Sequence, residues 1–126
     1  MPVENRILCE QRLIITRMFG EIVYEDVTNV AKFLQADPAF DPTYDQLVDL
    51  TEITKVNVLS DLLRNHARTV FPFHRDSLCA VIADSDLVFG MARMYASLQS
   101  ERREMKVFHT RKEAEMWLAS SKSISG

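Results

Sequence analysis

The chain has little of what interrupts, crosslinks or anchors a fold: its 126 residues include two cysteines, three glycines and four prolines. So few glycines and prolines argue against long flexible linkers. Two cysteines without a C-x-x-C spacing indicate neither a disulfide framework nor a zinc site, and we expect Cys9 and Cys79 to be buried and reduced. No apolar run approaches the ~20 residues that span a bilayer, and the first residues lack the segments of a signal peptide. These absences predict a cytoplasmic protein without a membrane span.

The composition is that of a single globular domain. Hydrophobic residues make up 47% of the chain, charged residues make up 26%, and the net charge is −3. This charge gives no broad basic surface, so we expect no nucleic-acid partner. We expect one domain over residues 1–126, with a core from 5 to 119 and a flexible tail over 120–126.

Hydrophobic periodicity predicts the order of the elements. Residues 7–9 and 13–19 indicate an antiparallel hairpin that Gly20 ends. A helix is predicted over 24–36, ended by Asp37-Pro38, from an apolar stripe at i, i+3, i+4 and i+7: Val27, Val30, Ala31 and Leu34. Further strands are predicted over 47–51, 78–84 and 105–108, and further helices over 59–70, over 87–98 and after the capping-box pattern Thr110-x-x-Glu113. The order β-β-α-β-α-β-α-β-α predicts an α/β fold with a mixed sheet.

Several segments, in this order along the chain, resemble the STAS/SpoIIAA-like fold of sulfate transporters and anti-sigma-factor antagonists. The chain looks most like the largely uncharacterised SpoIIAA-like proteins of bacteria. The matching segments are Gly20, Asp37-Pro38-Ala39-Phe40, Leu47-Val48-Asp49-Leu50, Ala80-Val81-Ile82-Ala83, residues 89–95, Val107-Phe108 and residues 113–118. The resemblance implies a non-enzymatic regulatory module that acts by contact with another protein.

One part of the chain departs from that family. Anti-sigma antagonists carry a phosphorylated serine in an Asp-Ser-Ser-Gly-type loop after the strand that matches 47–51. Residues 52–58 of this chain contain no Ser-Ser-Gly, so the serine phosphoswitch is not expected. The nearby hydroxyls are Thr51, Thr54 and Ser60, and helix capping by Thr54 or Asn57 is the structural alternative to phosphorylation.

Two predicted strands end on an aspartate and lead into a helix, and ligands of open α/β sheets bind at the carboxyl ends of strands. The candidate ligand or partner loops therefore contain Asp49, Thr51, Thr54, Asp84 and Ser85. Asp49 and Asp84 are also suited to capping helix N-termini. We find no catalytic constellation and no pattern for a cofactor or metal, because His66, His74 and His109 lack the i, i+3 or i, i+4 spacing of helix-borne metal sites.

A second candidate surface is cationic. Arg64, Arg68 and Arg75, together with His66 and His74, lie around Phe71-Pro72-Phe73. The three arginines offer bidentate donors to an anionic partner. A solvated helix face is the structural alternative. Met91 and Met94 fit either a core or a ligand pocket, and Gly90 predicts a close approach of its helix to the sheet.

Two functions stay open. The first is the regulatory module that binds an unidentified protein partner, and the second is a binder of a small apolar or anionic ligand, such as a Sec14-like lipid or metabolite, near the carboxyl ends of the inner strands. A packed interior favours the first, and an apolar cavity of a few hundred Å³ that opens near those strand ends favours the second. A homodimer is also predicted, because hairpin residues on a face short of helices would be uncovered: Leu8, Ile14, Thr16 and Met18.

Overall fold

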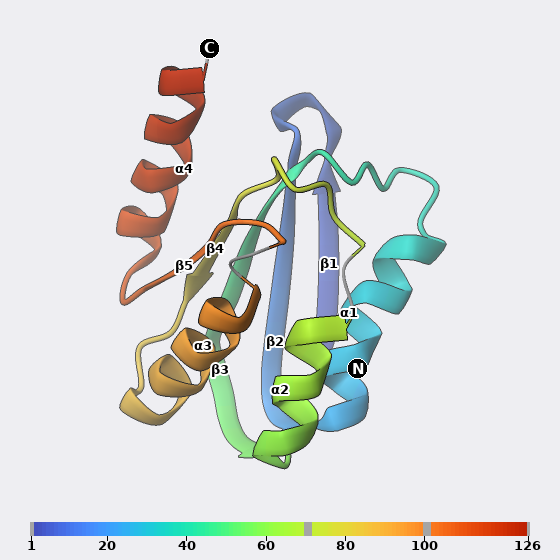
Figure 1. Ribbon diagram of the computed structural model, residues 1–126, viewed down its shortest axis with the longest axis vertical. Helices are drawn as coiled ribbons and strands as arrows, with labels where there is room; N and C mark the ends of the chain where they lie inside the picture. The colour runs from blue at the N-terminus through green and yellow to red at the C-terminus, as the bar shows by residue number, and fades with distance from the viewer. Residues whose placement is uncertain (1, 70–71, 100–101, 126) are drawn as a thin grey trace.

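The computed structural model describes residues 2–69, 72–99 and 102–125, with side chains described as far as residue 121. Five strands form one mixed sheet in which the spatial order follows the chain order (Figure 1). The strands are β1 (Val3–Leu8), β2 (Leu13–Val23), β3 (Asp45–Asn57), β4 (Cys79–Ile82) and β5 (Met105–Phe108). β1 is antiparallel to β2, and every other neighbouring pair is parallel. The predicted mixed α/β sheet is therefore confirmed.

Four α-helices connect or follow the strands: α1 (Tyr24–Ala36), α2 (Ser60–Thr69), α3 (Asp86–Gln99) and α4 (Arg111–Ser125). The predicted helix at 24–36 is confirmed at both ends. Asp37 is extended, as expected of a residue before proline. At the start of α4, the Glu113 N–H donates to Thr110 Oγ1 over 3.3 Å, the half of the predicted capping box that satisfies a free backbone donor.

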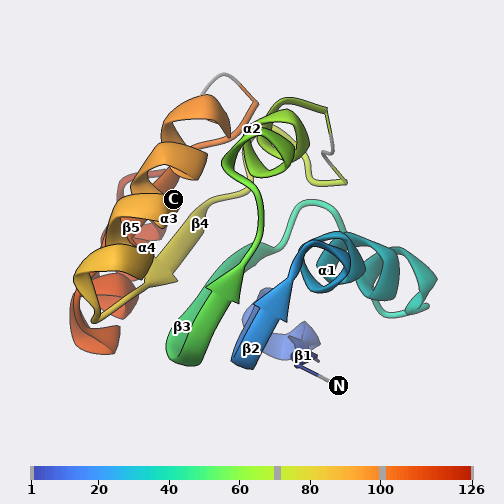
Figure 2. The ribbon, with the colours of Figure 1, turned by 90° about the horizontal axis from the view of Figure 1, so that it is seen from below.

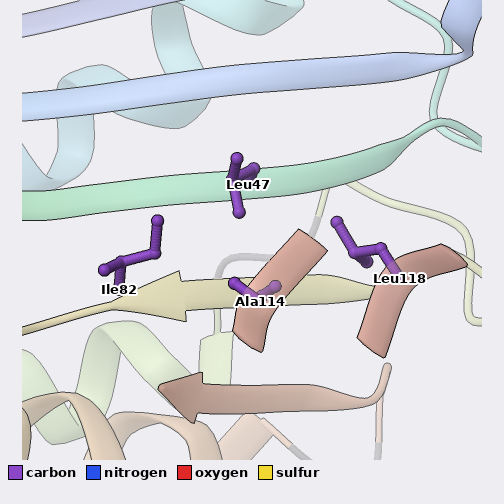
Figure 3. Close-up of a cluster of buried hydrophobic side chains, with 5 residues drawn as sticks. Leu47, Ile82, Ala114 and Leu118 are labelled. Atoms are coloured by element: carbon purple, nitrogen blue, oxygen red, sulfur yellow. The ribbon is translucent and has the colours of Figure 1, made fainter. Parts of the chain in front are cut away.

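The helices form layers on both faces of the sheet. α1, α2 and α3 lie on one side (Figure 2), while α4 lies on the other and packs against β3, β4 and β5. β4 is covered on both faces, and all four of its residues are buried. Beneath α4, Leu47, Ala80 and Ile82 of the sheet meet Ala114 and Leu118 (Figure 3).

Several expected boundaries were wrong. β3 continues to Asn57, so 52–57 is strand and not a loop after Asp49. Gly20 lies inside β2 with a φ of 74°, where the register between β2 and β3 shifts, and the strand ends at Val23. α4 includes residues 120–125, where we expected a tail. Val70, the last residue of the predicted helix over 59–70, lies outside the described residues.

Three expectations about packing were also wrong. Cys9 is exposed, because it lies in the single-turn 3₁₀ helix Cys9–Gln11 between β1 and β2. Gly90 is exposed, and a Cβ added there would meet nothing within 4 Å, so no close approach to the sheet explains it. Ile14, Thr16 and Met18 are buried, so they form no uncovered face for a dimer.

The part of the sheet that α4 leaves open carries both charged and partly buried apolar side chains, the latter including Leu8, Ile15 and Phe19. α4 leaves the β1–β2 side of its own face open, and Arg17 of β2 is paired there with acidic residues of both neighbouring strands. Its guanidinium donates two 2.9 Å hydrogen bonds to Glu52 and lies 3.4 Å from Glu4 Oε2. It also lies over the Phe19 ring. The hydrogen bonds from Arg17 lower the pKa of Glu52.

Candidate ligand-binding site

A cavity of about 180 Å³ lies between the sheet and helices α1, α2 and α3. β2, β3 and β4 supply its floor through side chains such as Met18, Val48 and Val81. α2 packs mainly against α3 and α1, and its Leu63 and His66 face the cavity. The lining is overwhelmingly aliphatic, so the space suits an apolar molecule better than water.

The polar groups of the cavity gather near one end of the sheet. Gln46 is the second residue of β3, and Arg103 precedes β5 by two residues. Arg103 Nη2 donates to Gln46 Oε1 over 2.6 Å, and Gln46 Nε2 donates to Thr16 Oγ1 over 2.7 Å. Arg103 Nη1 donates to Ser77 Oγ over 3.3 Å. This end therefore lies at the amino ends of β3, β4 and β5, opposite to the end where we expected a site.

Arg103 is held rigidly between the sheet and an aromatic ring. Its guanidinium carbon lies 3.8 Å from the centroid of the Phe73 ring, and the residue is only 5% exposed. Its backbone N–H donates to the Gln99 carbonyl, which fixes it to the end of α3. Burial lowers the pKa of the guanidinium, and the group stays a cation at neutral pH.

His66 and Tyr95 form a second polar pair in the cavity wall. His66 Nδ1 lies 2.7 Å from the Tyr95 hydroxyl, which also accepts a 3.3 Å hydrogen bond from Gln99 Nε2. Burial lowers the pKa of His66 and raises the pKa of Tyr95, so both are neutral at pH 7. The hydrogen-bond network assigns the hydroxyl proton to the bond with Nδ1, which leaves the imidazole proton on Nε2.

The predicted strand-end residues lie elsewhere. Asp49 and Thr51 are within β3, and Asp49 Oδ1 accepts hydrogen bonds from the Thr51 N–H and hydroxyl at 2.9 and 2.7 Å. Thr54 is an exposed residue of β3, which removes the proposed helix-capping role. Asp84 and Ser85 are exposed after β4, and Ser85 Oγ accepts from the Val88 N–H at the start of α3. All five are described residues, and none is among those that line the cavity.

The predicted cationic cluster divides between two sides of α2. Arg64, Arg68 and Arg75 are exposed, and Arg64 lies 3.7 Å from Asp61. His66 faces inward instead, and Phe73 is buried beneath Arg103. Phe71 lies outside the described residues. In the methionine-rich helix, Met91 and Tyr95 line the cavity, whereas Phe89 stacks on His109 outside it.

Across the described residues, His, Cys, Asp and Glu side chains form no group of three that could hold a metal ion. None of the helices, as far as the structure describes them, is long and apolar enough to cross a bilayer.

Arg103 and Gln46 were not predicted from the sequence as members of a site. Arg103 lies in a stretch of charged residues that reads as a surface turn, and Gln46 reads as the polar start of a strand. A signal exists only in retrospect: both residues lie at the amino-terminal edge of a strand, Gln46 as the second residue of β3 and Arg103 two residues before β5.

This architecture, a mixed five-stranded sheet with helices on both faces, defines a protein with a SpoIIAA-like fold. The chain is similar to a crystal structure from Shewanella loihica, described as an uncharacterised DUF3478-family protein with a SpoIIAA-like fold. The match has a TM-score of 0.55 and 20% identity, and it covers 92% of this chain and 91% of the other. No protein-family model and no curated protein matches the sequence. The structural match confirms the fold that the sequence segments indicate.

Proposed function

We propose that the protein is a binding module that holds a small, mainly apolar molecule in the cavity between the sheet and helices α1–α3. The observation that carries the proposal is the cavity itself, about 180 Å³ of space lined by aliphatic side chains within a domain of 126 residues. Protein interiors are normally packed to the density of organic crystals, and an engineered apolar cavity of about 150 Å³ binds benzene. This supports ligand binding, the second of the two functions that the sequence left open.

The volume of the cavity indicates how large a ligand it can surround. By comparison with benzene, it suits a molecule of about six to eight non-hydrogen atoms. A complete lipid would need a larger space, since sites for drug-sized molecules measure about 300–1,000 Å³. The proposal is therefore a small metabolite, or a short acyl or aromatic compound.

The test measures thermal unfolding with 1-hexanol and with benzene as probes. At ten times its dissociation constant, a ligand that binds only the folded state stabilises it by about 1.4 kcal/mol, which raises Tm by about 5 °C in a chain of this size. Titration calorimetry would give the stoichiometry, which we expect to be one.

A matched pair of variants locates the binding. Ala31 lines the cavity from α1, whereas Ala36 is exposed at the end of the same helix. Ala31→Leu fills part of the cavity and should abolish the stabilisation, while Ala36→Leu should retain it. Absence of stabilisation by every probe, or equal stabilisation of both variants, would refute the proposal.

The sequence also favours regulation by contact with a protein partner, and this stays a prediction. The exposed Arg64, Arg68 and Arg75 are its proposed surface. Charge reversal of Arg68 and Arg75 should weaken the binding of any partner that affinity capture identifies.

A further inference from the structure

The one cation among the described residues of the cavity wall has no aspartate or glutamate beside it in that wall, although the charge of Asp45, the first residue of β3, acts on it. Among the described residues that line the cavity, Arg103 is the only one with a permanent charge, and none is an aspartate or glutamate. The ion pairs between described residues do not include Arg103. Its polar contacts are the neutral oxygens of Gln46 and Ser77. Charges this deeply buried are normally paired with an opposite charge.

The same end of the cavity presents hydrogen-bond donors without acceptors. Arg103 Nε and His66 Nε2 are buried atoms with no hydrogen-bond partner, and each residue is only 5% exposed. With the Tyr95 hydroxyl assigned as donor to His66 Nδ1, the ring proton is on Nε2, which is therefore a donor. Arg103 Nε is a donor in every state. Leaving such groups unsatisfied is costly, and an acceptor on a ligand would satisfy them.

Resting on the proposed function, we infer that the cavity takes a monocarboxylate with a short apolar body, its carboxylate at Arg103 and its apolar part against the aliphatic side chains of the cavity floor, such as Val48 and Val81. The planar guanidinium fork matches a carboxylate. One cation balances one negative charge, so a phosphate dianion would bring a second charge with no cation to receive it. The Phe73 ring holds the guanidinium in place before the ligand arrives.

The competing explanation is that Arg103 is purely structural. The carboxyl end of α3 carries partial negative charge, and Arg103 is attached to it through the Gln99 carbonyl. That interaction stabilises a cation at this position without any ligand. The two explanations differ in whether the protein prefers a charged over a neutral ligand of the same shape.

The experiment compares three probes of one chain length: hexanoate, 1-hexanol and hexylamine, by titration calorimetry at about pH 7.5, where hexanoate is ionised. We expect hexanoate to bind about tenfold to a hundredfold more tightly than 1-hexanol, the range that a charge-assisted hydrogen bond provides. Hexylamine should bind more weakly than 1-hexanol, because its ammonium would meet Arg103. This comparison uses the unaltered protein and does not depend on any variant folding.

Variants then assign the preference to a residue. Arg103→Met keeps the length of the side chain without its charge and should make hexanoate and 1-hexanol bind equally. Arg102→Met is the matched control, because Arg102 is the neighbouring arginine and does not line the cavity; it should retain the preference. His66→Phe should reduce the hexanoate preference by a smaller factor and leave 1-hexanol binding unchanged.

The outcomes distinguish a failure of the carboxylate inference from a failure of the proposed function. Equal binding of hexanoate and 1-hexanol, or tighter binding of hexylamine, refutes the carboxylate inference and leaves the proposed function standing. A preference that survives Arg103→Met also refutes it. No binding of any of the three probes refutes the proposed function itself.

Discussion

The two glycines at positions 20 and 90 predict opposite effects of one chemical change. Gly90 is an exposed residue inside α3, and Gly20 lies in β2 with a φ of 74°. A Cβ added at either position would meet no atom within 4 Å. Steric contact is thus the same in Gly90→Ala and Gly20→Ala, and only the backbone conformation differs.

The expected magnitudes follow from that difference. Alanine is favoured over glycine inside a helix by about 1 kcal/mol, so Gly90→Ala should raise the free energy of unfolding by about that amount. The left-handed region costs an L-residue about 1–2 kcal/mol, so Gly20→Ala should lower it by at least about 1 kcal/mol. With an unfolding entropy of about 2.1 cal/mol/K per residue, each 1 kcal/mol corresponds to about 4 °C in Tm.

The assay is calorimetric or circular-dichroism melting of the wild type and both single variants, with urea denaturation as a second measure of stability. We expect Tm values separated by about 8 °C, with the wild type between the variants. A Gly90→Ala variant less stable than the wild type would show that position 90 of α3 is in close contact with other atoms, where the structure leaves space for a Cβ. A Gly20→Ala variant as stable as the wild type would contradict the left-handed backbone at position 20.

Two further predictions concern the core and a buried histidine. Leu118→Ala removes a buried side chain from the cluster beneath α4 and should lower the free energy of unfolding, measured by urea denaturation, by about 3 kcal/mol. Met116→Ala, at a residue 60% exposed, should change it by no more than about 0.5 kcal/mol. Equal effects of the two substitutions would contradict the packing of α4 in Figure 3. Burial lowers the pKa of His66 in the folded protein below 6.5, so the unfolded chain binds a proton at this residue more readily than the folded protein does. The free energy of unfolding should therefore fall as the pH drops from about 6.5 toward the pKa of His66 in the folded protein. His66→Gln should weaken this pH dependence and His74→Gln, at an exposed histidine, should not; the same slope in both would refute the assignment.

The sequence predicted the type and order of the elements because each has a local signal. The stripe on α1 and the uninterrupted apolar run of β4 depend only on which residues neighbour one another along the chain. The extent of β3 was missed for a tertiary reason. Its second half pairs with β2 alone, because the pairing with β4 ends at Asp49 and Ile82. This second half of β3 is partly exposed and therefore tolerates polar residues such as Thr54. In the sequence, such residues indicate a loop.

The candidate site shows the same limit. The aspartates at 49 and 84 were chosen from a rule about the carboxyl ends of strands, and neither lines the cavity. Met91 was recognised as fitting either a core or a pocket, and only the packing of α1, α2 and α3 over the sheet makes it part of a cavity wall. Apolar side chains that fill a core and those that surround a space have the same pattern in the sequence.

The sequence by itself determined an α/β fold with a SpoIIAA-like order of elements, because periodicity and helix-end residues act locally. The tertiary structure alone decided that α4 packs on one face against β3, β4 and β5, that a cavity remains under the other three helices, and that Arg103 and His66, each with a buried nitrogen atom that has no hydrogen-bond partner, line it. Those features join residues from β3, α2, α3 and the segment before β5. Their proximity depends on how the elements pack, which no local pattern encodes.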